Sequence, residues 1–182
     1  VIISKSGLVS VIGGKWTTFR KMAEDTLNKA IKISGLPFVK CSTQNLRIHG
    51  YLNSVIINND VLQIYGSDET KIRELISKNP ELGEPLFPQN IYIKAQVVWA
   101  VHEEMARTVE DVLARRLRVL FLDAKLAIDM APGVAKIIAE GLHKDNDWQQ
   151  KQLNDFVILA NNYLLNPYFP SWFQSNAQQL KQ

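Results

Sequence analysis

The sequence is poor in several kinds of residue and segment, and each shortage excludes a class of protein. Cys41 is the only cysteine among 182 residues, so no internal disulfide can form and the chain fits a reducing compartment. The three histidines and one cysteine are too few for a zinc site, and we expect no metal. The longest apolar runs, such as 97–101, fall far short of the ~18 residues that a transmembrane helix needs. The first residues also lack the charged segment and cleavage site of a signal peptide.

Charge of one sign is in only slight excess. Twenty-one Lys and Arg residues face 18 Asp and Glu residues, a formal net charge of +3, and hydrophobic residues make up 46% of the chain. This composition allows a packed core and is too weakly basic to indicate a nucleic-acid partner. The densest basic cluster, 115–118, follows Glu110 and Asp111 directly, which also argues against nucleic acid. The same cluster could favour contact with anionic lipid.

The first forty residues follow the order strand, glycine turn, helix. The chain begins at Val1 rather than Met, and we expect it to be a piece of a longer protein. Residues 7–12 are apolar and β-branched, which predicts a short buried strand. A glycine pair follows, and apolar residues then recur at helical spacing until Gly35. Turn-rich polar residues over 41–58 predict a connection to a second unit.

Beyond that connection, apolar spacing predicts helices almost throughout. The expected helices are 60–65, 68–78, 91–105, 109–116, 123–130, 132–142 and a last one from 147 onward. Thr108 and Asp111 have the spacing of a capping box, Pro132 fits the first position of a helix, and Asp147 fits an N-cap. The sequence therefore predicts a mainly α fold with a helical C-terminal domain over 59–166.

The glycine turn at Gly13-Gly14 carries the strongest chemical signal. A helix N-terminus has unpaired N–H groups and a positive dipole end, and glycines let a ligand approach the backbone. Lys15 adds a point charge suited to phosphate, and Thr17 and Thr18 add hydroxyl groups. The pattern predicts a site for an anionic group. It matches neither a phosphate-binding P-loop nor a dinucleotide fingerprint, so a plain strand-to-helix turn with a solvated lysine stays open as the alternative.

Two separated motifs carry a resemblance to a known family. Residues 11–24, VIGGKWTTFRKMAE, resemble the GGK-x-TT-[YF]-R signature of FAD-dependent glycerol-3-phosphate dehydrogenases of the aerobic type. Residues 99–116 and 120–124 resemble the C-terminal helical domain of the same family. The resemblance implies that residues 1–40 are the last strand and helix of an α/β FAD-binding oxidoreductase domain. The FAD fingerprint of the family is missing from this chain.

The resemblance also implies roles for the residues of the turn. Backbone N–H groups of Gly13, Gly14 and Lys15 would face the flavin and stabilise the negative charge of its reduced form. Lys15 would also contact the phosphate of glycerol 3-phosphate, and Thr17 and Thr18 would cap the helix beside the cofactor. A catalytic base cannot be identified in this chain.

The resemblance implies that the parent protein oxidises sn-glycerol 3-phosphate to dihydroxyacetone phosphate and passes electrons to quinone. FAD would be bound mainly by the missing part, so the fragment alone would be inactive. The parent would be a bacterial enzyme of the cytoplasm, bound peripherally to the cytoplasmic face of the membrane. It would also form a homodimer.

The alternative function is a non-catalytic helical docking domain. Its contacts would come from Arg115 and Arg116 or from the aromatic tail over 167–182, which could instead be a strap packed on the helices. The charged residues predict i,i+4 ion pairs that stabilise helices, Glu103 with Arg107 and Asp111 with Arg115. Arg20 is expected to form a structural ion pair.

Overall fold

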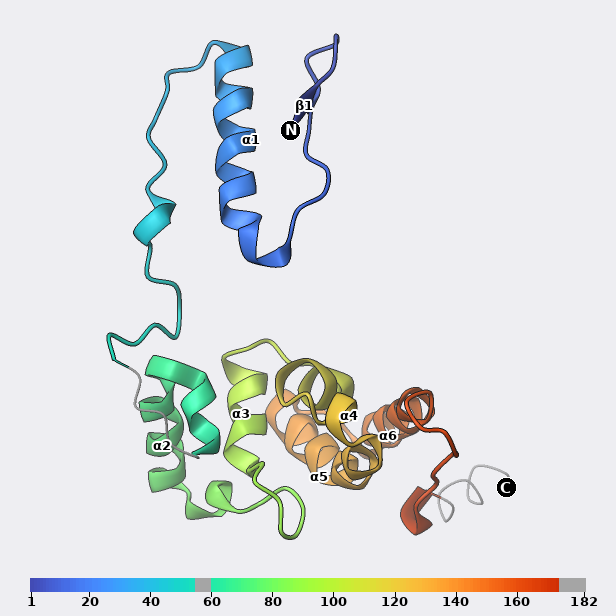
Figure 1. Ribbon diagram of the computed structural model, residues 1–182. Helices are drawn as coiled ribbons and strands as arrows, with labels where there is room; N and C mark the ends of the chain where they lie inside the picture. Colours follow the sequence, from blue (N-terminus) through green and yellow to red (C-terminus); the bar gives the residue numbers. More distant parts are fainter. Residues whose placement is uncertain (55–59, 174–182) are drawn as a thin grey trace. The chain divides into compact units, whose positions relative to one another are not determined.

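The computed structural model describes residues 1–54 and 60–173, and these residues are mainly helical, as the sequence predicts (Figure 1). Contacts divide the chain into two compact units, one of them Val1–Tyr51 and the other beginning at Leu52. The predicted limits near residues 40 and 58 stay predictions. The end of the predicted connection, the first residue of the predicted helical domain and the last part of the predicted tail lie outside the described residues.

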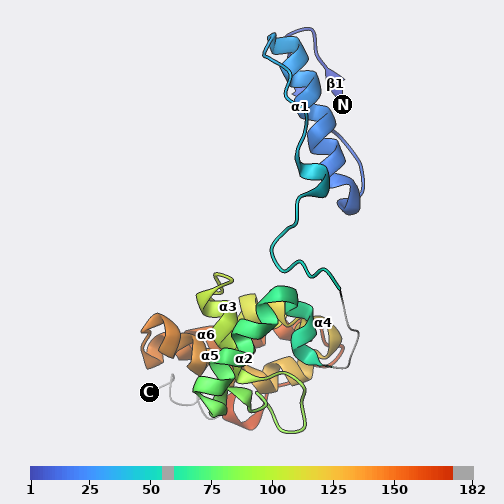
Figure 2. The ribbon, with the colours of Figure 1, turned by 90° about the vertical axis from the view of Figure 1, so that its left-hand side faces the viewer.

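The first unit consists of a small hairpin and one long helix that lies beside it (Figures 1 and 2). Strands β1 (Ile2–Ile3) and β2 (Val9–Ser10) pair antiparallel, with Ile2 opposite Ser10 and Ile3 opposite Val9. The short helix η1 (Trp16–Thr18) leads into α1 (Phe19–Ser34), which ends at Gly35 in the left-handed conformation. A further short helix, η2, spans Thr43–Asn45.

The strand prediction for residues 7–12 is wrong in length and in burial. β2 contains two residues, both half-buried, and Leu8, Val11 and Ile12 are exposed. The reason is that β2 pairs with β1 alone, and no described residue of Val1–Tyr51 is buried. Burial of a strand on both faces requires neighbouring layers, so this unit has no core of its own.

The second unit is entirely helical in the residues that the structure describes, apart from a single bridge between Pro85 and Ile93. Its helices are η3 (Val61–Asp68), α2 (Glu69–Lys78), η4 (Pro80–Gly83), α3 (Lys94–His102), the π-helical segment η5 (Asp111–Arg116), α4 (Val119–Leu122), α5 (Ala124–Leu142) and α6 (Asn146–Asn161). Helix α5 packs between α3 and α6 (Figure 1).

The main core of this unit forms along α5. Its apolar stripe, which includes Ile128, Val134 and Ile138, is fully buried against α3, η5, α4 and α6. Helix α6 contributes Phe156 and Val157 to the same core. A smaller core of Leu62, Ile72, Ala95 and Trp99 joins η3 and α2 to α3. Burial of these apolar side chains supplies the main stabilisation of the helical unit.

Several predicted helix boundaries are wrong. The helix predicted over 91–105 begins at Lys94 and ends at His102. It could not extend to 105, because the backbone of Met105 is left-handed (φ 59°). Pro132 begins no helix but lies inside α5. An interior proline costs ~3 kcal/mol, and the buried stripe on both sides of Pro132 offsets that cost.

The cap of the last helix also differs from the prediction. Asp145 Oδ1, rather than Asp147, accepts a hydrogen bond from the N–H of Trp148 at 2.9 Å. Asp147 lies in the first turn of α6, where a negative charge still interacts favourably with the helix dipole.

Candidate functional site

The glycine turn lies between β2 and α1 and requires its two glycines. Gly13 and Gly14 have φ angles of 78° and 105°, which residues with a side chain rarely adopt. A Cβ on Gly14 would also lie 2.7 Å from Met22 Cε and would overlap Met22 Sδ, whereas a Cβ on Gly13 would meet no atom within 4 Å. The Met22 side chain therefore covers one side of Gly14, and the surroundings of Gly13 are open.

Thr18 binds the backbone of Lys15 in both directions. Its Oγ1 accepts a hydrogen bond from the N–H of Lys15 at 3.2 Å and donates one to the carbonyl oxygen of Lys15 at 2.8 Å. The N–H of Thr18 donates to the same carbonyl at 2.9 Å. Lys15 is thereby held in an extended conformation (φ −108°, ψ 151°) just before η1.

The donors left for an anion are fewer than the sequence predicts. The N–H of Lys15 is already paired with Thr18. Within residues 1–54 and 60–173, the N–H groups of Gly13 and Gly14 and the ammonium group of Lys15 have no hydrogen-bond partner. The hydroxyl group of Thr17 likewise makes no hydrogen bond to another described residue, and Thr17 is exposed. Two backbone donors and one cation thus lie together at this turn.

An open apolar groove of about 620 Å³ lies beside these donors. Trp16, Phe19 and Leu27 line it together with the glycines of the turn. Trp16 is 90% exposed, and its ring centroid lies 6.2 Å from that of Phe19. An apolar wall next to N–H donors and a cation fits one edge of a flat ring system that carries negative charge, as a reduced flavin does.

Arg20 forms the structural ion pair that the sequence predicts. Its Nη1 lies 2.6 Å from Glu24 Oε2 and also reaches Thr43 Oγ1 at 3.3 Å. The hydrogen bond between Arg20 and Glu24 raises the pKa of Arg20 and lowers the pKa of Glu24. Arg20 therefore joins α1 to the segment around η2 and does not point to a ligand.

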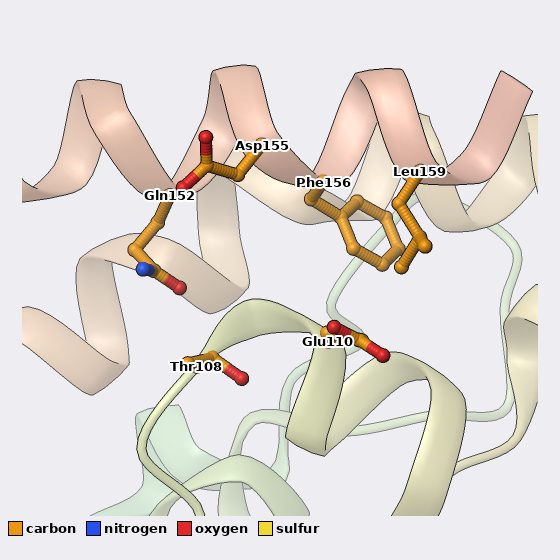
Figure 3. Close-up of a pocket in the computed structure, with 6 residues that line it drawn as sticks. All are labelled: Thr108, Glu110, Gln152, Asp155, Phe156 and Leu159. Carbon is orange, nitrogen blue, oxygen red and sulfur yellow. The ribbon is translucent and has the colours of Figure 1, made fainter.

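A second, smaller hollow lies in the helical unit between the start of η5 and α6 (Figure 3). It has a volume of about 110 Å³. Gln152 Oε1 accepts the N–H of Val109 at 3.1 Å, and the carboxylates of Glu110 and Asp155 are paired with Arg115 and Lys151. The polar side chains of Gln152, Glu110 and Asp155 are therefore paired within the protein, and the hollow is a packing gap where η5 meets α6.

The basic cluster at 115–118 does not form a continuous basic surface. Arg115 pairs with Glu110 and Asp111, at 2.6 and 3.1 Å, as predicted for the second of these acids. Arg116 turns inward and donates to the carbonyl oxygens of Glu104 and Asp111. Two of the three arginines are thus occupied within the unit, which weakens the prediction of a docking or lipid-binding surface here.

The other predicted ion pair of this region is wrong. Arg107 does not pair with Glu103, because α3 ends at His102 and the two residues do not share a helix. Instead, Arg107 Nη1 donates to the carbonyl oxygens of Val101 and Ala106, at 3.0 and 2.8 Å. The spacing of charges could not reveal this role, which depends on where the helix ends.

The described part of the aromatic tail is a strap on the helical unit. Asn161 accepts the N–H of Tyr168 at 2.6 Å and donates to its carbonyl oxygen at 3.1 Å. The hydroxyl of Tyr168 donates to Asp129 at 2.8 Å, and this bond raises the pKa of Tyr168. Trp172 and Phe173 pack against the main core. Sequence reasoning missed Asn161, because nothing in its local pattern marks it as a partner of the tail.

Neither a metal-binding cluster nor a membrane-spanning helix occurs among the residues that the structure describes. No group of three or more His, Cys, Asp or Glu residues there is placed to hold a metal ion. No helix in this part of the chain has the length and apolar character needed to cross a membrane.

Comparison with known proteins places the glycine turn and most of the helical unit in one family. The family model described as the C-terminal domain of alpha-glycerophosphate oxidase matches residues 9–151. The chain belongs to this family. The match spans the glycine turn and continues to the first third of α6, so both motifs of the resemblance lie within it. No solved structure matches the chain.

Curated relatives of this family are named glycerol-3-phosphate dehydrogenases. The mitochondrial proteins of Macaca fascicularis and Homo sapiens are each 31% identical over 99% of this chain and 26% of their own length. A probable mitochondrial glycerol-3-phosphate dehydrogenase of Dictyostelium discoideum is 33% identical over 89% of the chain and 27% of its own length. The chain thus spans about a quarter of the length of these relatives.

Proposed function

We propose that the chain is the C-terminal part of a flavin-dependent enzyme that oxidises sn-glycerol 3-phosphate to dihydroxyacetone phosphate. The observation that supports this most strongly is the turn itself, where two N–H groups that have no partner among the described residues, a lysine and an apolar wall lie together. The relatives named glycerol-3-phosphate dehydrogenase support the substrate and the reaction class.

Within this proposal each residue of the turn has a role. Lys15 attracts and orients the phosphate group of the substrate as a point charge. The N–H groups of Gly13 and Gly14 stabilise negative charge at the edge of the flavin ring. The flavin, when bound, accepts the hydride from C2 of the substrate. Thr17 offers an exposed hydroxyl to the cofactor, and Thr18 supports Lys15.

The proposal extends to parts that this chain does not contain. FAD is bound mainly by the rest of the parent protein, so the chain by itself is inactive. Electrons pass from the flavin to quinone, which requires that the parent contacts a membrane peripherally. A bacterial enzyme at the cytoplasmic face, acting as a homodimer, fits that reaction. Reduction of a soluble quinone by the substrate-reduced parent, compared with reduction of molecular oxygen, tests the acceptor.

The test of the main proposal uses the full-length parent protein. Addition of glycerol 3-phosphate without oxygen is expected to bleach the flavin absorbance band. Lys15→Ala is expected to raise KM for glycerol 3-phosphate by about 10- to 100-fold, as for the loss of a charge-assisted contact, without loss of flavin. Lys21→Ala is the matched control, because Lys21 pairs with Asp25 at 2.6 Å on the same helix.

Three outcomes would contradict parts of this proposal. A yellow protein that does not bleach would refute the substrate, and a colourless protein would refute the cofactor. If Lys15→Ala bleaches with the wild-type KM, then Lys15 does not bind the phosphate.

A further inference from the structure

We propose that Thr18 is the positioning residue of Lys15: its hydroxyl group fixes the backbone of the lysine and so the direction from which the ammonium group reaches the substrate phosphate. This inference rests on the proposed function, because it assigns a task to Lys15. It adds a residue whose effect on substrate passes through another side chain.

The two hydrogen bonds of the Thr18 hydroxyl meet Lys15 on both sides of its Cα. One bond accepts from the N–H of Lys15 at 3.2 Å, and the other donates to its carbonyl oxygen at 2.8 Å. These two backbone groups lie on either side of the φ and ψ rotations of Lys15. One hydroxyl group therefore restrains both dihedral angles, and the direction of the Lys15 Cα–Cβ bond follows from them.

The neighbours of Lys15 show why such a restraint is needed. The two residues before it are glycines with positive φ, and glycine restricts the backbone least of all residues. Without the Thr18 hydroxyl, the bond from the Thr18 N–H to the Lys15 carbonyl at 2.9 Å would remain, but no bond between described residues would hold the N–H of Lys15 against rotations at Gly13 and Gly14. Thr18 supplies the rigidity that the glycine pair lacks.

The Met22 side chain packs against both Thr18 and Gly14. Its Sδ lies 3.5 Å from Thr18 Oγ1 and in the space that a Cβ on Gly14 would occupy. The hydroxyl group has a single proton, and the Lys15 carbonyl is nearer and a stronger acceptor than sulfur. The Thr18 hydroxyl therefore donates its proton to the Lys15 carbonyl oxygen, and the Met22 sulfur only packs against the hydroxyl.

The charged end of Lys15 is free to act on a ligand. The side chain is exposed and has no ion-pair partner within the described residues. A fixed backbone below an unpaired ammonium group limits the volume in which the charge moves, and positioning of this kind lowers the entropic cost of binding.

The test is a double-mutant cycle in the full-length parent protein with its flavin. The variants are Lys15→Ala, Thr18→Val and the double variant, with Thr18→Ser as the conservative rescue. The matched control is Thr70→Val, because Thr70 is exposed on α2, in the second unit, and does not line the apolar groove beside the turn. Two quantities are measured, KM for glycerol 3-phosphate and the Kd for inorganic phosphate by calorimetry.

The expected result is a rise of about 10-fold in both quantities for Thr18→Val. Thr18→Ser and Thr70→Val are expected to keep the wild-type values. In the Lys15→Ala background, Thr18→Val is expected to change neither quantity further, because a residue that acts through Lys15 has no effect without it. If Thr18→Val does not retain flavin, Thr18→Ala takes its place in the cycle.

Other outcomes separate this inference from the proposed function. If Lys15→Ala raises KM but Thr18→Val does not, the proposed function stands and the inference is refuted. The inference is also refuted if Thr18→Val has the same effect with and without Lys15, or if Thr18→Ser is as defective as Thr18→Val. If Lys15→Ala itself changes neither quantity, Lys15 does not bind the phosphate and the inference is refuted, whereas bleaching of the flavin by glycerol 3-phosphate would still support the proposed reaction.

Discussion

Thr108 and Asp111 cap each other at the start of the π-helical segment. Thr108 Oγ1 accepts the N–H of Asp111 at 3.0 Å, and Asp111 Oδ2 accepts the N–H of Thr108 at 3.1 Å. The same carboxylate oxygen also accepts the N–H of Arg107 at 3.0 Å. Two side chains thus satisfy three backbone donors where α3 has ended and the next helical turns begin.

Removal of this cap is expected to destabilise the helical unit. Thr108→Ala should lower the free energy of unfolding by about 1 kcal/mol, the usual cost of a lost cap, and Thr108→Ser should keep it. Urea unfolding of the 182-residue chain measures the change, because Val1–Tyr51 has no buried residue to add a second transition. Thr70→Ala, at an exposed position of α2, is the control. Equal losses for Thr108→Ala and Thr70→Ala would contradict the assignment.

The carboxylate of Asp111 makes this stability depend on pH. Burial acts to raise the pKa of Asp111, but hydrogen bonds from Arg107 and Thr108 and the charge of Arg115 outweigh burial and lower it. The folded pKa lies below the unfolded one, so the stabilisation is present at neutral pH and is lost as the pH falls through the folded pKa. Asp111→Asn is expected to be less stable at pH 7, by a margin that shrinks in acid.

Unfolding measured between pH 3 and 7 tests this dependence. Asp155→Asn is the control, because Asp155 lies on the surface and pairs with Lys151 at 2.8 Å. A difference between wild type and Asp111→Asn that is constant with pH would show that the carboxylate charge is not what stabilises the cap.

The Thr108–Asp111 cap was predictable from the sequence, since it depends on two residues three positions apart. Helix α1 was predictable for the same reason, as its apolar spacing and Gly35 are local signals. The end of α3 was not, because no glycine or proline in the sequence marks the left-handed backbone at Met105. The continuous α5 was hidden by Pro132, whose local cost is outweighed by burial that no short pattern reveals.

The candidate site divides in the same way. The Gly13-Gly14 turn and the nearby Lys15 were evident from residue types alone. The pairing of Lys15 N–H with Thr18 was not, although a capping role for Thr18 was expected, because the direction of a hydroxyl group depends on the precise backbone path. The sequence alone does not decide whether the aromatic tail is a strap or a docking contact. The reason is that the side chain of Asn161 bonds the backbone of Tyr168, and residue types do not reveal a backbone contact.

Arg116 and Arg115 are neighbours in the chain, but substitution of Arg116 is expected to destabilise the protein more than substitution of Arg115. Arg116 donates from two nitrogens to the carbonyl oxygens of Glu104 and Asp111, and its side chain is 21% exposed. Arg116→Lys should cost about 1.5–3 kcal/mol of unfolding free energy, because lysine cannot form this fork. Arg115→Lys should cost less than about 1 kcal/mol, because Arg115 forms exposed ion pairs. The two variants are compared by urea unfolding, and equal costs would refute the difference in roles.

Asn161 is expected to hold the aromatic strap in place. Asn161→Ala removes two hydrogen bonds to the backbone of Tyr168 and should release the strap, so that chymotrypsin cleaves after Tyr168 more quickly. Asn162→Ala is the control, because Asn162 is exposed and follows α6. The rate of cleavage at native conditions is the measurement. An unchanged rate in Asn161→Ala would show that the Tyr168–Asp129 hydrogen bond and the apolar contacts of Trp172 and Phe173 hold the strap without Asn161.

Gly13 and Gly14 offer a matched pair of substitutions at the proposed site. Both have positive φ, so alanine introduces backbone strain of the order of 1 kcal/mol at either position. At Gly14 the new Cβ would also overlap the Met22 sulfur, whereas at Gly13 it would enter open space. In the parent protein, Gly14→Ala is therefore expected to lower the thermal midpoint and the flavin content more than Gly13→Ala does.

Met22→Ala provides the decisive background for that comparison. If the overlap with Met22 causes the extra loss, the two glycine substitutions should become equal once Met22 is alanine. The losses of thermal midpoint and flavin caused by Gly14→Ala and by Gly13→Ala, each measured in the Met22→Ala background, should then be the same. Thermal midpoint and bound flavin, measured on all five variants, separate this cause from strain. A gap between the two glycine positions that persists without Met22 would assign the loss to the backbone conformation of Gly14, and the packing of Met22 below the turn would then have no share in it.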